Sequence, residues 1–100
     1  MSRYELAPSA AADLLEIFRY SKVTWGAVQA QRYREELELA LQQLALAPAM
    51  GHKRETLAPG LRSFSVAEHI AFYVERRSRI TIVRILHPRM DAHEAFEKDE

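Results

Sequence analysis

The chain has 100 residues, 48% of them hydrophobic, which is enough for one domain with a single core. It contains no cysteine, and this excludes disulfides and thiolate metal sites. The formal net charge is zero, but residues 51–90 carry eight Lys/Arg and three Glu, whereas residues 91–100 carry one Lys and five acids. The basic middle segment suits an anionic partner, although a mixture of solvated charges explains the same counts.

The chain also lacks the marks of several protein classes. Its N-terminal residues have no apolar run of the signal-peptide type, and no stretch is long enough to span a membrane. We find no nucleotide-binding loop, nucleophile elbow, paired-carboxylate set or zinc motif, which argues against a conventional metabolic enzyme. We therefore expect a soluble cytoplasmic protein that uses no metal or cofactor and does not contact a membrane.

The first third of the chain predicts a short strand and a helix. The alternation of residues 3–6 indicates the strand. Either Pro8 occupies the first helical turn or Ser9 caps the helix. The helix is expected to run to about Trp25 and to end at Gly26. Its apolar stripe steps by three and four residues through Leu14, Ile17, Phe18, Ser21 and Trp25.

A second helix is predicted from about Ala27 to Ala47, where Pro48 stops it. The apolar face of this helix comprises Ala30, Tyr33, Leu37, Ala40, Leu41, Leu44 and Ala45. Because the connection at Gly26 is so short, the two helices must be antiparallel neighbours.

The remainder of the chain predicts a loop and three strands. Residues 48–60 hold two prolines and two glycines, so we expect a loop. The period then changes to two, which predicts strands at Leu61–Val66, His69–Glu75 and Ile80–His87 joined by hairpins. Residues 88–100 form a short turn of helix or a frayed tail. The order β-α-α-β-β-β indicates one α+β domain over residues 1–100, with an antiparallel helical hairpin on one face of a small, mainly antiparallel sheet.

Several short stretches of the chain together match a known family, and they are Tyr4–Pro8, Asp13–Ile17, Trp25-Gly26, Gly60–Arg62, His69–Tyr73, Arg84–His87 and Met90-Asp91. Through them the chain resembles the RelE/ParE toxin superfamily, and within it the ParE type. Their order and spacing carry the resemblance, because no single stretch is specific. The resemblance implies the toxin of a type II toxin–antitoxin pair, neutralised by a ParD-like antitoxin and touching operator DNA only through that antitoxin. ParE-type members are associated with inhibition of DNA gyrase, and RelE-type members with ribosome-dependent cleavage of mRNA.

The nuclease alternative needs a base near the 2′-hydroxyl, cations at the phosphate and an acid at the leaving oxygen. Arg62, Arg84 and His87, on strands expected to be neighbours, form the smallest candidate catalytic set. Each also has a structural explanation. Arg84 alternates with Ile80, Ile82 and Leu86, so it is expected to point to the same face as these apolar residues. It can bind carbonyls or an acid such as Asp91 or Glu16, while His87 precedes a proline and can cap a turn.

A toxin that acts by binding is the interpretation we favour, because the density of basic residues is low for a protein that grips ribosomal RNA. The candidates for contacting its target are Lys53, Arg54, Arg62 and Arg89. Tyr73 and Trp25 are expected in the core. A third possibility is a toxin-like fold retained only as a binding module.

The antitoxin is expected to lay an amphipathic helix and an extended segment across exposed apolar surface. The outer face of the helical hairpin still carries Leu15, Val28 and Leu39, so these are the candidate antitoxin contacts.

Overall fold

The computed structural model describes residues 4–77 and 79–97. Its elements, in chain order, are β1 (Tyr4–Leu6), α1 (Pro8–Trp25), α2 (Ala27–Leu46), the 3-10 helix η1 (Pro48–Met50), β2 (His52–Lys53), β3 (Leu61–Val66), β4 (His69–Arg76), β5 (Arg79–Leu86) and α3 (Ala92–Glu97). Arg3, expected in the first strand, and the charged residues 98–100 lie outside the described residues.

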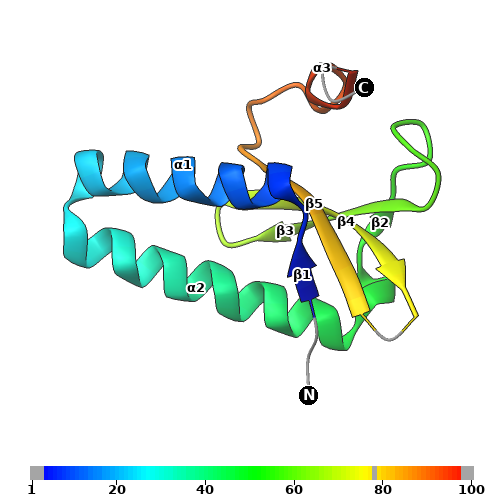
Figure 1. Ribbon diagram of the computed structural model, residues 1–100, viewed down its shortest axis with the longest axis horizontal. Coiled ribbons are helices and arrows are strands. Elements are labelled where there is room, and N and C mark those ends of the chain that lie inside the picture. Colours follow the sequence, from blue (N-terminus) through cyan, green and yellow to red (C-terminus); the bar gives the residue numbers. More distant parts are fainter. Residues whose placement is uncertain (1–3, 78, 98–100) are drawn as a thin grey trace.

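The strands form one five-stranded sheet in the order β1-β5-β4-β3-β2. β1 pairs parallel to β5, and the other neighbours are antiparallel, which confirms the predicted α+β class and the mainly antiparallel sheet (Figure 1). β2 was not predicted, because it lies in the segment interpreted as a loop. A pair of residues is too short to show the alternation by which strands are recognised in a sequence.

The helical hairpin packs on one face of the sheet through α1 and α2 (Figure 1). Pro8 is the first helical residue of α1, so Ser9 does not cap it. Gly26 joins the helices with a φ of +93°, a conformation that side chains disfavour. Trp25 was expected in the core, but it is 66% exposed. The end of the hairpin extends beyond the strands, which leaves the last turn of α1 without a sheet to pack on.

The second face of the sheet has its own apolar cover, which we did not predict. Along β4, Ala71 and Tyr73 belong to the core under the helices, whereas Phe72 belongs to a separate cluster with Leu61 and Leu86. Successive strand residues point to opposite faces, so this cluster lies on the face away from the hairpin. The ring of Phe96 in α3 meets Phe72 edge-on at 5.3 Å between centroids.

A β-bulge in β5 changes which residues of that strand share a face. Phe72 pairs with Arg84, but the next residue of β4 pairs with Ile82, so two residues of β4 oppose three of β5. As a result Ile82 and Ile85 both lie in the core under the helices, while Leu86 lies in the opposite cluster. The expectation that Leu86 shares a face with Ile80 and Ile82 is therefore wrong.

The hydroxyl of Tyr73 fixes the segment that follows α2. It donates to the carbonyl of Pro48 at 2.6 Å and accepts from the backbone N–H of Gly51 at 2.9 Å. Tyr73 is fully buried, as predicted, and both bonds satisfy groups that would otherwise be buried alone. A Cβ at position 51 would collide with the tyrosine hydroxyl, so glycine is required there by close packing.

Candidate functional site

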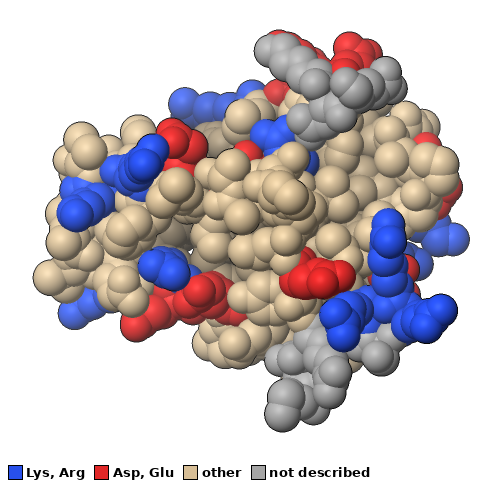
Figure 2. All heavy atoms as spheres, in the orientation of Figure 1, with Lys and Arg blue, Asp and Glu red and all other residues tan. Residues whose placement is uncertain are grey.

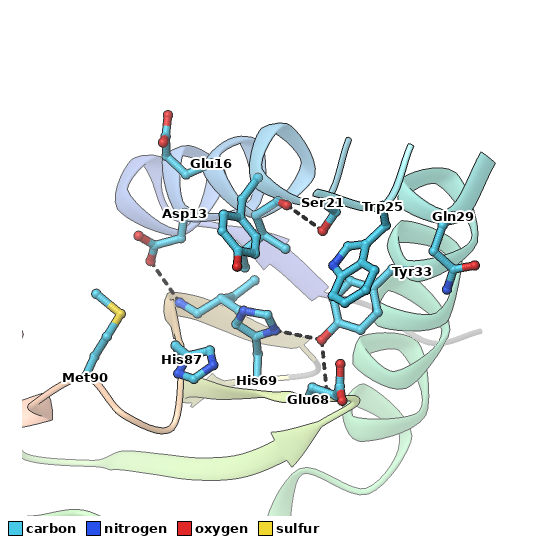
Figure 3. Close-up of a pocket in the computed structure, with 13 residues that line it drawn as sticks. Asp13, Glu16, Ser21, Trp25, Gln29, Tyr33, Glu68, His69, His87 and Met90 are labelled. Carbon is cyan, nitrogen blue, oxygen red and sulfur yellow. Dashed lines mark hydrogen bonds between the residues drawn. The ribbon is translucent and has the colours of Figure 1, made fainter. Parts of the chain in front are cut away.

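A groove of about 940 Å³ lies between the helical hairpin and the adjoining ends of β4 and β5 (Figure 3). Its walls come from α1, α2, the turn between β3 and β4, and the segment after β5. The side chains that matter most for its chemistry are Tyr20, Trp25, Tyr33, Glu68, His69 and His87.

Tyr33 and His69 form the fixed centre of the groove. The phenolic oxygen of Tyr33 accepts the backbone N–H of Glu68 at 2.9 Å and lies 2.6 Å from Nδ1 of His69. One of these two groups donates the shorter bond and the other accepts it, depending on which ring nitrogen of His69 carries the proton. The ring of His87 meets that of His69 at right angles, with centroids 5.7 Å apart.

Burial sets the protonation of both central residues. It lowers the pKa of His69 from its ordinary 6.5, and His87 lowers it further, whereas Glu68 opposes the change. His69 is therefore neutral at pH 7. Burial raises the pKa of Tyr33 above its ordinary value, so its hydroxyl keeps its proton. The pair is a neutral hydrogen-bonded unit with no net charge of its own.

The remaining walls are aromatic and acidic. Tyr20 and Trp25 on α1 are 67% and 66% exposed, which is high for large aromatic side chains. Three carboxylates, Asp13, Glu16 and Glu68, line the groove, and within the described part of the chain none of its lining residues is Lys or Arg. The arrangement therefore favours a ligand that is partly apolar and not anionic.

The structure does not assemble the candidate nuclease set. Arg62 lies on β3 and Arg84 on β5, and β4 runs between these strands. Contrary to the expectation, the two strands are therefore not neighbours. Arg62 donates to the carbonyl of Gly51 at 2.8 Å. His87 accepts the backbone N–H of Arg89 through Nδ1 at 3.1 Å, which is the turn-capping role considered from the sequence.

Arg84 forms a bidentate ion pair with an acid other than those expected. Its Nε and Nη2 atoms lie 2.8 and 3.0 Å from the two carboxylate oxygens of Asp13 on α1. The same carboxylate accepts the backbone N–H of Ile85 at 2.9 Å. Asp91 and Glu16, the predicted partners, do not make this bond. Arg84 thus links β5 to α1.

The candidate target-binding residues are partly brought together. Lys53 on β2 lies directly opposite Arg62 on β3, an arrangement of like charges that gives this edge of the sheet positive potential. Arg54 is half-buried, with its guanidinium 5.5 Å from the centre of the Phe72 ring. Arg89 is exposed in the turn after β5.

The candidate antitoxin contacts are exposed as expected, at 50% for Leu15, 71% for Val28 and 55% for Leu39. On the face in Figure 2, Lys and Arg gather over the closed end of the helical hairpin and the tip of the β4–β5 hairpin, and much of the area between is uncharged. Sequence reasoning missed the groove, because its central residues, Tyr33 and His69, are 36 positions apart. The sequence hint was a polar tyrosine tip on an otherwise apolar helix face.

Two features are absent from residues 4–77 and 79–97. No group of three or more His, Asp or Glu side chains there is placed to hold a metal ion. No helix in this range is both long enough and apolar enough to cross a membrane.

Comparison with known proteins identifies the family. The sequence profile described as "ParE toxin of type II toxin-antitoxin system, parDE" matches residues 4–92. A protein named Toxin ParE1 from Mycobacterium tuberculosis is 41% identical over 91 residues, which cover 90% of this chain and 93% of the relative. Toxin ParE1 from Caulobacter vibrioides is 38% identical, with 92% and 95% covered, and Toxin ParE from Escherichia coli is 37% identical, with 91% and 89% covered.

The fold has a counterpart among solved structures. A chain from a chromosomal ParDE TA system of P. aeruginosa superposes with a TM-score of 0.73 at 24% identity, covering 87% of this chain and 96% of that one. The likeness at this identity concerns the fold, and the sequence matches establish the family. The chain belongs to the ParE toxin family of type II toxin–antitoxin systems.

Proposed function

We propose that this toxin acts in the cytoplasm by binding and inhibiting DNA gyrase, without chemistry of its own, and that a ParD-like antitoxin neutralises it. The observation that favours binding over catalysis is that two of the candidate catalytic residues, Arg62 and Arg84, are bound to other groups of the protein. Arg84 is held by Asp13, and Arg62 by backbone carbonyls, on strands that β4 separates. An RNase that uses the 2′-hydroxyl needs several free cations around one phosphate.

The positive edge formed by Lys53 and Arg62, with Arg54 beside it and Arg89 after β5, is the proposed contact with the target. Such surface charges raise association rates and fix orientation more than they add affinity. The interaction should therefore weaken as salt is added, because dissolved ions screen exposed charges over a Debye length of about 10 Å at 0.1 M ionic strength.

One experiment separates the two proposed targets. The chain is expressed alone, and gyrase supercoiling and cleavage of translated mRNA are scored in the same cells. We expect relaxed DNA and intact mRNA. Ribosome-positioned cuts together with normal supercoiling would replace gyrase inhibition with the alternative function, a RelE-like ribosome-dependent mRNA endonuclease. The observation that favours this alternative is the adjacent pair of imidazoles, His69 and His87, in the groove.

The proposed antitoxin covers the exposed apolar surface of the helical hairpin, including Leu15, Val28 and Leu39. Binding that favours the folded state by mass action adds about 2.7 kcal/mol when the antitoxin is present at 100 times its Kd. We therefore expect the product of the neighbouring gene to raise the melting temperature of the toxin. The neutralisation proposal would be contradicted if the isolated chain is monodisperse and its melting temperature does not change when that product is added.

A further inference from the structure

The groove is electrostatically opposite to the proposed target-binding edge. Its lining includes Asp13, Glu16 and Glu68, and no described lining residue is Lys or Arg. The edge at Lys53 and Arg62 is basic and suits an anionic surface. A cationic ligand for the groove therefore belongs to a different partner from the one that binds the basic edge.

The three carboxylates of the groove are not equally available. Asp13 already binds Arg84 and the backbone of Ile85. Glu16 lies 3.3 Å from Arg19 in an exposed pair. The carboxylate of Glu68 makes no ion pair with any described residue, and its charge raises the pKa of both Tyr33 and His69. Glu68 is thus an exposed anion held close to the aromatic centre of the groove.

The aromatic side of the groove complements that anion. Figure 3 shows Trp25 and Tyr33 together at the helical wall, with Glu68 beneath Tyr33 and His69 beside it. Aromatic faces attract cations, and arginine in particular stacks on them while its fork binds a carboxylate. His69 is neutral at pH 7 and so does not repel a cation.

We propose that this groove takes up an arginine side chain carried by an amphipathic segment of the antitoxin. This inference rests on the proposed neutralisation by an antitoxin. The guanidinium binds Glu68 and lies against Trp25 or Tyr33, while apolar residues of the same segment cover the exposed rings of Tyr20 and Trp25. The chemistry of the lining indicates the occupant, because exposed aromatic rings beside an anion suit a partner that presents apolar and basic side chains together.

The single tryptophan of the chain makes the groove directly observable. The purified antitoxin, freed of tryptophan by Trp→Phe substitution where it has any, is titrated into the toxin while Trp25 fluorescence is recorded, and calorimetry measures the same binding. Glu68→Gln should weaken binding about 10-fold, a typical effect for a close charge pair. Glu75→Gln, which removes an exposed charge at the other end of β4, should leave affinity unchanged. Circular dichroism melting verifies that both variants fold.

Arginine-to-glutamine substitutions in the antitoxin then identify the anchor. One of these substitutions should weaken binding to the wild-type toxin about 10-fold. It should have no further effect on the Glu68→Gln toxin, because the arginine substitution and Glu68→Gln remove the same interaction. Unchanged affinity of folded Glu68→Gln, or heat of binding without a Trp25 fluorescence change, overturns the groove assignment. If that same antitoxin still restores gyrase supercoiling, the proposed function survives. If the antitoxin does not bind at all, the neutralisation proposal fails and takes this inference with it.

Discussion

Arg84 and Asp13 are 71 positions apart in the sequence, yet they form a two-pronged ion pair at 2.8 and 3.0 Å that joins the last strand of the sheet to the first helix. Both side chains are only 15% exposed. Asp13→Asn removes the carboxylate charge that binds the guanidinium, and breaking a largely buried pair costs about 3 kcal/mol of unfolding free energy. Urea denaturation measures this loss.

The matched control for that change is Arg19→Gln, which breaks a pair whose side chains are 67% and 74% exposed. Exposed pairs contribute about 0–1 kcal/mol, so this variant should unfold almost as the wild type does. Equal losses from Asp13→Asn and Arg19→Gln would show that the link between β5 and α1 does not stabilise the fold.

Gly51 and Tyr73 should behave as a coupled pair. Gly51→Ala pushes a methyl group against the tyrosine hydroxyl, and overpacking of this kind costs about 1–3 kcal/mol. Tyr73→Phe removes the hydrogen bonds to Gly51 and Pro48. It should lower the free energy of unfolding by about 1–3 kcal/mol, because the buried N–H and carbonyl lose their hydrogen-bond partner. Because the phenylalanine also removes the nearest clashing atom, the double variant should lose less than the sum of the two. Strict additivity in a thermal or urea series would refute this close contact.

The stability of the fold should depend on pH through His69. Its pKa in the folded protein is lowered, so below about pH 6.5 the unfolded chain binds a proton that the folded chain resists. The free energy of unfolding is therefore highest above pH 6.5 and falls as the pH drops through the folded-state pKa. His69→Gln, which keeps an acceptor for the Tyr33 hydroxyl, should show a shallower decline between pH 7.5 and 5. Parallel curves for the two proteins would exclude His69 as the source.

Toxicity should respond gradually to the basic surface and weakly to His87. His87→Ala removes one ring and a turn cap, and a binding toxin should tolerate this change. Lys53→Gln, Arg54→Gln and Arg89→Gln together should weaken gyrase binding, and the loss should become smaller as salt rises. A general acid–base contributes about 10²–10⁴ in rate, so all-or-none loss of toxicity from a folded His87→Ala toxin would instead identify the nuclease.

The short helix α3 should protect the second face of the sheet. Phe96 is half-buried and touches the ring of fully buried Phe72. Phe96→Ala should cost about 1–2 kcal/mol from lost apolar burial and the ring contact. It should also increase the binding of a hydrophobic dye, which Glu97→Gln in the same helix should not. A dye signal that stays at the wild-type level would argue that the loop at Leu57 covers this face unaided.

The fold was largely predictable because its signals are local. The spacing of Leu37, Leu41 and Leu44 marks the buried face of α2, and the alternation from Leu61 to Val66 gives β3 its observed bounds. Gly26 sets the hairpin. β2 escaped prediction because His52 and Lys53 carry no periodic pattern of their own.

The site was far less predictable, because its contacts join distant residues. Asp13 and Glu16 on α1 are equally plausible partners for Arg84 in the sequence, and only the packing of α1 on β5 selects Asp13. The bulge opposite Phe72 breaks the two-residue period, so the face assigned to Leu86 was wrong. Trp25 has the spacing of a core residue, but the helix carries it past the edge of the sheet.

The parallel pairing of β1 with β5 has a consequence for how the protein is made. Thr81 bonds to Glu5 across a separation of 76 residues, and among the described strands β1 pairs with β5 alone. Ribosomes add about 5–20 residues per second, so the first strand waits roughly 4–15 s for its partner. The sheet therefore cannot close until β5 has been synthesised. Until then the growing toxin chain remains incompletely folded on the ribosome, so a partner that recognises the closed sheet cannot bind the early nascent chain.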